Sequence, residues 1–299
     1  MPNEFLSTGA SSIDRLLDGG LERGSLSSIH ADPDTGKSWL TLQLAAMCNR
    51  AEEDGGFDAP ALIIDTEGFY SEKVLKKLLN FFKKRWDFPE MQVDVIQTRN
   101  IESLYELFGL RPHISIVGLK MQASVEALNT PIKDGRKIIG YLDYLEGSQI
   151  WKMVEDKGYE FIAIDGISMP LKARAFPNSL SWLAGRAALL TPFMNTVNDL
   201  TIRKGIVIFV THHLTKSDVT KQESGWGHPW GGDIVRYVQK RMLLMMRPLK
   251  AQRESFGQRA KRLHLYRLPG EEQKTIVVDL AKDTGFVDAL PSGGRKVKG

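Results

Sequence analysis

The sequence predicts an α/β protein with a mostly parallel, twisted β-sheet that is flanked by helices and ends in antiparallel strands. Short apolar runs alternate with one-sided helical patterns through the first two-thirds of the chain, and such alternation is typical of a parallel sheet. Three strand-like segments then follow one another with only polar turns between them. We therefore expect antiparallel strands without intervening helices at the end of the sheet.

The strands and helices are expected in chain order from the spacing of apolar residues. Strands are expected at SLSSIH (25–30), ALIID (61–65), VDVIQT (93–98), FIAID (161–165) and GIVIFVTHH (205–213). The apolar run ALIID is typical of a buried strand in a parallel sheet. Apolar residues at helical spacing indicate helices at 38–49, 74–82, 101–110 and 189–200. Pro192 complicates the first turn of the last helix. The terminal strands are expected within RMLLMMRP, KRLHLYRLP and KTIVVDLA.

The domain organisation follows from the one stretch that breaks this alternation. Residues 111–150 fit it least well, and we interpret them as an insertion within a single domain that spans 1–290. The last nine residues, PSGGRKVKG (291–299), are small, polar and basic. We expect them to form a flexible basic tail.

Composition restricts the class of protein. The 299 residues include 40 Lys and Arg against 36 Asp and Glu, a net charge of +4, with 42% apolar and 25% charged residues. These values exclude a disordered chain, a collagen-like repeat and a disulfide scaffold. The single cysteine, Cys48, cannot form an internal disulfide, which fits a reducing compartment. Without an apolar run of about 20 residues or a signal peptide at MPNEFLSTGA, we expect a soluble cytoplasmic protein with no membrane partner.

A local excess of basic residues lies within 236–267. This span holds ten Lys and Arg and one acidic residue, Glu254. Such an excess can form a surface that attracts phosphate backbones, and it can equally be a solvated face without a polyanionic partner. The sequence leaves both interpretations open.

A phosphate-binding loop is indicated at ADPDTGKS (31–38), between an expected strand and an expected helix. The pattern is G-x-x-x-x-G-K-[ST], with Ala31 in place of the first glycine. Gly36 allows the turn that points backbone amides at phosphates, Lys37 neutralises their charge, and Ser38 offers a hydroxyl to magnesium. The expected nucleotide-binding residues are Ala31, Asp32, Pro33, Asp34, Thr35, Gly36, Lys37, Ser38 and Trp39.

Two carboxylates follow buried strands of the same expected sheet. Asp165 closes FIAID, where it is expected to hold magnesium together with Ser38. Glu67 follows ALIIDT, in the crevice where parallel sheets bind ligands. A carboxylate there can orient and deprotonate an attacking water. ATP and Mg²⁺ are therefore the expected cofactors, with Glu67 and Lys37 as catalytic residues.

The ordered set of motifs resembles the ATPase core of RecA-type recombinases, closest to the archaeal RadA and RadB group and the eukaryotic recombinases. The motifs that carry the resemblance are the lead-in FLSTGASSIDRLLDGGLERG, the phosphate loop, IDTEG (64–68), FIAID, VTHH (210–213), WGGDI (230–234) and LYRLP (265–269). The resemblance covers nearly the whole chain apart from 111–150 and the tail. It implies a RecA-like P-loop NTPase core.

The resemblance also implies roles for further residues. His213 falls where the group has the glutamine of a Thr-Asn-Gln that senses the γ-phosphate, so it joins the expected catalytic set. The group's two DNA loops fall near 168–186 and 216–230, where cations and aromatic rings alternate as single-strand binding requires. For any single tryptophan there, core packing is an equal alternative. The expected DNA-binding residues are Lys172, Arg174, Arg186, Lys216, Lys221, Trp226, His228, Trp230, Gly231 and Gly232.

The expected function is that of an ATP-dependent DNA-binding protein of recombinational DNA repair, a weak DNA-stimulated ATPase. His212-His213 replaces Asn-Gln, the capping segment lacks its aspartate, and no Phe-x-x-Ala tether precedes the core. An archaeal, RadB-like paralogue that assists the main recombinase fits these departures better than a filament-forming recombinase. The expected partners are single-stranded DNA, a recombinase or paralogue and a second copy of the chain, with a place at the nucleoid. The alternatives are a nucleotide-binding regulatory scaffold and a KaiC-like signalling ATPase with little hydrolysis.

Overall fold

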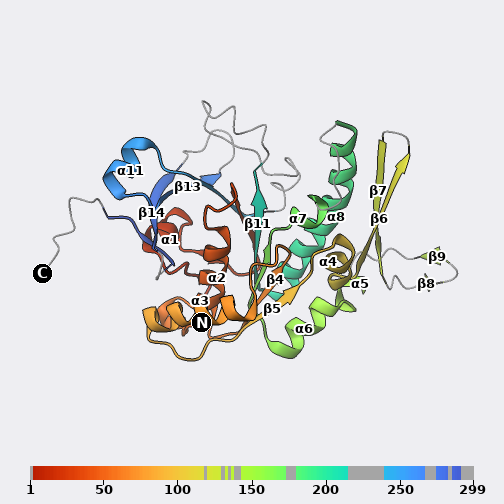
Figure 1. Ribbon diagram of the computed structural model, residues 1–299. Helices are drawn as coiled ribbons and strands as arrows, with labels where there is room; N and C mark the ends of the chain where they lie inside the picture. Colours follow the sequence, from red (N-terminus) through yellow and green to blue (C-terminus); the bar gives the residue numbers. More distant parts are fainter. Residues whose placement is uncertain are drawn as a thin grey trace, which may run out of the picture.

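A nine-stranded sheet forms the centre of the protein (Figure 1). The computed structural model describes residues 3–117, 120–128, 132–133, 136–137, 143–172, 180–214, 239–266, 274–281 and 285–290. The strand order is β15-β14-β13-β12-β3-β11-β10-β4-β5. The parallel part comprises β3 (Leu26–Ala31), β4 (Ala61–Asp65), β5 (Val93–Gln97), β10 (Phe161–Asp165), β11 (Val207–His213) and β12 (Arg241–Met246).

Antiparallel strands extend this sheet at its C-terminal end. They are β13 (Ala260–Tyr266), β14 (Thr275–Ala281) and β15 (Gly285–Asp288). The mostly parallel α/β fold with antiparallel C-terminal strands is therefore confirmed. One expectation is wrong, because helix α11 (Lys250–Phe256) separates β12 from β13. None of its residues is buried, so it has no apolar face that sequence periodicity could detect.

Helices cover both faces of the sheet (Figure 1). Helices α1 (Ser11–Leu16), α2 (Lys37–Cys48) and α3 (Glu72–Trp86) share one apolar cluster with the sheet. The opposite cluster takes residues from α4 (Ile101–Leu107), α5 (Asp143–Glu146), α6 (Gln149–Lys157) and α8 (Leu180–Lys204). Residues alternate between the clusters along β4, β10 and β11, with Ile63 in the first and Ile64 in the second. This two-sided burial explains why the strands read as continuous apolar runs.

Two helices differ in length from the expectation. Helix α8 is 25 residues long and continues through Pro192, which lies inside it. Helix α4 ends at Leu107, and Leu110 already belongs to a strand. Gly109 adopts a φ of +73° between them, a left-handed conformation that ends a helix and that glycine tolerates best.

Residues 111–150 contain a β-hairpin that the spacing of apolar residues does not predict. Strands β6 (Leu110–Val117) and β7 (Lys120–Ala127) pair antiparallel, and β8 (Ile132–Lys133) pairs with β9 (Arg136–Lys137). Ile114 faces Ala123 across the hairpin, and both pack against the core that includes α8. The interpretation of this region as an insertion stays a prediction.

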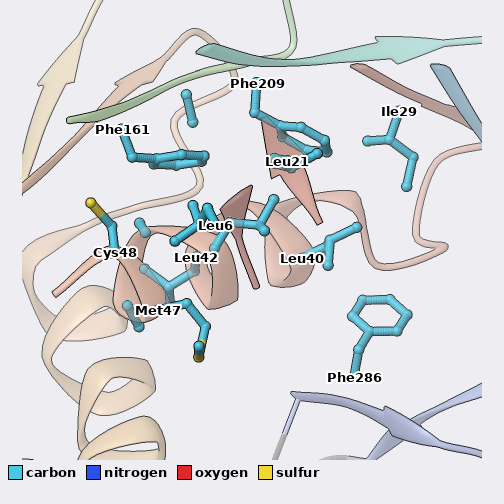
Figure 2. Close-up of a cluster of buried hydrophobic side chains, with 14 of the residues drawn as sticks. Leu6, Leu21, Ile29, Leu40, Leu42, Met47, Cys48, Phe161, Phe209 and Phe286 are labelled. Carbon is cyan, nitrogen blue, oxygen red and sulfur yellow. The ribbon is translucent and has the colours of Figure 1, made fainter. Parts of the chain in front are cut away.

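Both ends of the described chain are fastened to helix α2. The short strands β1 (Phe5–Leu6) and β2 (Leu21–Glu22) pair in the lead-in. The Gln43 side-chain amide of α2 donates to the carbonyls of Thr8 (2.7 Å) and Phe286 (3.0 Å), and its oxygen accepts from the Phe286 amide at 2.6 Å. Figure 2 shows α2 with Phe161 and Phe209 on one side and Phe286 on the other. These contacts hold the phosphate-loop helix between the sheet and the last hairpin.

Candidate nucleotide-binding site

The expected phosphate loop connects β3 to α2 with a backbone shaped by two left-handed residues. Asp34 has a φ of 59° and Gly36 a φ of 113°. A Cβ on Gly36 would lie 2.7 Å from Leu280 Cδ2 and 3.1 Å from Phe286 Cζ, so glycine is required by space as well as by conformation. The first amides of α2 follow directly, and such helix N-termini bind anions.

Lys37 lies inside this loop. It is 6% exposed, and its Nζ donates to the carbonyls of Ala31 (3.3 Å) and Asp32 (3.0 Å). Burial lowers the pKa of Lys37, and the carboxylates of Glu67 and Asp165 act in the opposite direction. The ammonium therefore stays within the loop that would surround phosphates.

Asp165 ends strand β10 and is surrounded by donors. Its carboxylate accepts hydrogen bonds from Thr211 Oγ1 at 2.6 Å, from the Tyr70 hydroxyl at 2.9 Å and from the Ser38 side chain. Burial raises its pKa, and these three hydrogen bonds act in the opposite direction. The structure thus brings the two expected magnesium ligands, Ser38 and Asp165, into contact.

Two of the three expected catalytic residues, Glu67 and His213, are also in contact. His213 Nε2 lies 2.7 Å from Glu67 Oε1. The Glu67 side chain lies directly against Gly166, which has a φ of +89°. A Cβ at Gly166 would lie 2.4 Å from Glu67 Oε1, so any larger residue would collide with the carboxylate. Glycine after Asp165 is therefore what lets the carboxylate of Glu67 approach strand β11.

Asp65 organises the turn that carries Glu67. Its carboxylate accepts hydrogen bonds from the backbone amides of Glu67 (3.1 Å), Gly68 (2.7 Å) and Tyr70 (2.9 Å). Sequence reasoning missed Asp65, Tyr70, Gly166 and Thr211 as parts of the site. Thr211 could have been found, because it lies in the VTHH segment directly before the two histidines.

The donor set suits magnesium. Ser38 offers a hydroxyl and Asp165 a carboxylate, and Mg²⁺ prefers such oxygen ligands alongside substrate phosphates. Within the described residues no group of three or more His, Cys, Asp or Glu could hold a metal alone. Both observations are consistent with a magnesium site in which Ser38 and Asp165 supply two oxygen ligands and the phosphates of a nucleotide supply others.

The comparison with protein families gives a match to the N-terminal third of the chain. Residues 4–109 match the family model Rad51. This segment is similar to the core of RecA-type recombinases. The matched segment covers about a third of the chain and includes the lead-in, the phosphate loop and Glu67. The match confirms the resemblance and supports a RecA-like recombination and repair ATPase. The particular similarity to the RadA and RadB group stays a prediction.

Most of the expected DNA-binding residues lie outside the described residues, namely Arg174, Lys216, Lys221, Trp226, His228, Trp230, Gly231 and Gly232. The tail 291–299 lies outside them as well. Lys172 ends helix α7 (Met169–Lys172), and its side chain is not among those described. Arg186 lies in α8 and is 8% exposed, and burial lowers its pKa. Its burial does not favour a direct contact with a phosphate backbone.

The basic excess of 236–267 is partly neutralised within the protein. Lys240 forms an ion pair with Glu22, and Arg241 lies 3.7 Å from Asp18. Burial lowers the pKa of Lys261, and the charge of Arg247 lowers it further. Both interpretations of this surface therefore remain open.

Trp39 lies beside the phosphate loop and packs on helix α3. Trp39 follows Ser38, and its ring stacks on Phe81 with centroids 6.3 Å apart. Contact of Trp39 with a nucleotide stays a prediction.

Among the helices that the structure describes, none has the length and apolar character needed to cross a bilayer.

Proposed function

We propose that this protein is an ATP-dependent DNA-binding protein of recombinational DNA repair. It binds Mg-ATP at the phosphate loop and single-stranded DNA, and it assists a main recombinase as a paralogue of it. The observation that carries the proposal is a convergence of five side chains at the carboxyl ends of the parallel strands. They come from helix α2 (Lys37 and Ser38), the turn after β4 (Glu67) and the ends of strands β10 and β11 (Asp165 and His213). The Rad51 match over 4–109 supports it.

Each side chain has a role that its position allows. The Lys37 ammonium would move from the loop carbonyls to the outer phosphates, because a charged acceptor binds it more strongly than a neutral one. Ser38 and Asp165 would hold Mg²⁺, which neutralises phosphate charge when bound.

Glu67 is the candidate base. Its carboxylate would accept a proton from an attacking water, and His213 would hold that carboxylate in place through their hydrogen bond of 2.7 Å. A nucleoid location belongs to the same proposal.

The test measures ATP turnover with and without single-stranded DNA. We expect weak turnover that DNA stimulates, and we expect Lys37→Ala to abolish the stimulation. Glu67→Gln should lower turnover by about 10²- to 10⁴-fold, the usual contribution of a general base, while it leaves ATP binding in place. Tight binding of ATP and DNA with no turnover would instead support a regulatory scaffold or a KaiC-like signalling ATPase.

A further inference from the structure

Tyr70 connects the two elements that supply the expected magnesium ligands. Its side chain is 2% exposed and comes from the turn after β4. The hydroxyl oxygen lies 2.9 Å from Asp165 Oδ2 and 2.8 Å from the carbonyl oxygen of Ser38. One buried hydroxyl therefore touches both the end of strand β10 and the first turn of α2.

The turn holds Tyr70 independently of these contacts. Its backbone amide donates to Asp65 Oδ2 at 2.9 Å, and its ring packs edge-on against Phe69 with centroids 4.9 Å apart. The backbone and the ring of Tyr70 therefore have contacts of their own, and its hydroxyl is left to contact Asp165 and Ser38.

The single hydroxyl hydrogen decides which contact matters. A phenol can donate to one acceptor at a time, and two acceptors face Tyr70. An ionised carboxylate is the stronger acceptor, and the Ser38 carbonyl has an acceptor role within helix α2 in any case. Donation to Asp165 is therefore favoured when that carboxylate is ionised, as a magnesium ligand must be.

We propose that Tyr70 is a positioning residue for the magnesium site, which orients the Asp165 carboxylate toward Ser38 without contacting the metal. Thr211 donates to the other carboxylate oxygen, Oδ1, at 2.6 Å, so the two donors together set the rotation of the carboxylate. Partners of this kind typically change metal affinity by about 10- to 100-fold. The inference rests on the proposed binding of Mg-nucleotide at this site.

The experiment compares Tyr70→Phe with a matched control. Tyr105→Phe also removes a buried hydroxyl, one that donates to the Leu189 carbonyl at 2.9 Å in the opposite core. Calorimetry of ADP binding across a range of Mg²⁺ concentrations measures the midpoint of the Mg²⁺ dependence, and ADP binding in EDTA measures the contribution of the loop alone. Thermal melts of both variants measure stability.

We expect Tyr70→Phe to raise the Mg²⁺ midpoint by about 10-fold or more and to leave ADP binding in EDTA unchanged. Tyr105→Phe should keep the wild-type midpoint even if its melting temperature falls. A Tyr70→Phe midpoint within about twofold of wild type would overturn the inference and leave the proposed function intact. A wild-type protein that binds no nucleotide with or without Mg²⁺ would overturn both.

A second variant keeps the test decisive if Tyr70→Phe does not fold. Tyr70→His retains a ring and an N–H donor, and we expect its Mg²⁺ midpoint to be raised because the shorter side chain reaches Asp165 less well. An unchanged midpoint in folded Tyr70→His would count against a positioning role.

Discussion

Replacing Gly166 by alanine separates the conformational role of this residue from its role in catalysis. Gly166 has a φ of +89°, and an added Cβ would lie 2.4 Å from Glu67 Oε1. The left-handed conformation alone costs a non-glycine residue about 1–2 kcal/mol. The overlap should be relieved by movement of Glu67, because its side chain is flexible and 26% exposed. The stability loss should therefore stay near about 1–2 kcal/mol.

The movement of Glu67 should appear in turnover instead. A displacement of about 1 Å in a catalytic group can lower the rate by about 10²-fold, so we expect a loss of that order with ATP affinity nearly unchanged. Gly158→Ala is the matched control, because Gly158 has a φ of +70° and nothing within 4 Å of the added Cβ. It should lose a similar stability in urea unfolding and keep full turnover.

Two outcomes would refute this reasoning. If Gly166→Ala kept wild-type turnover, the placement of Glu67 over Gly166 would not matter for hydrolysis. If Gly166→Ala lost several kcal/mol more than Gly158→Ala, the overlap would not be relieved by Glu67.

Three further predictions concern the loop, the sheet and DNA. Gly36→Ala should lose about 2–5 kcal/mol in urea unfolding, from left-handed strain and overpacking against Leu280 and Phe286; a cost below about 1 kcal/mol would contradict the packing. Burial, with a smaller contribution from Arg262, lowers the pKa of His264 to about 4, so the unfolded state binds more protons between pH 6.5 and 4 and stability falls on acidification. His264→Gln should flatten that fall in unfolding free energy; an unchanged slope would exclude His264 as its source. Binding of single-stranded DNA should weaken from low to moderate salt in a fluorescence titration, and salt-independent binding would argue against phosphate contacts.

The site could be predicted from sequence where a motif is local. The phosphate loop is eight consecutive residues, and Glu67 and Asp165 each follow an apolar run, so strand ends and spacing were sufficient. The contact of His213 with Glu67 required the resemblance to a family, because 146 residues separate them.

The rest depends on contacts that no local pattern records. Tyr70 and Asp165 are 95 residues apart, and the hydroxyl that joins them resembles any other tyrosine in a turn. From the sequence alone, Gly166 can be interpreted only as a turn residue, because its contact with Glu67 is visible only in the structure. Helix α11 is not predicted because none of its residues is buried and it has no continuous apolar face. The β6–β7 hairpin is not predicted because tertiary packing against α8 supports it.

Calorimetry with ATP at saturating Mg²⁺ tests the central claim most directly, with wild type and Lys37→Ala compared at equal concentration. We expect one site per chain in the wild type, and an affinity about 10- to 100-fold weaker without the Lys37 ammonium, the loss expected for a hydrogen bond to a charged group. No binding heat in the wild type, or equal affinity in both proteins, would contradict the account.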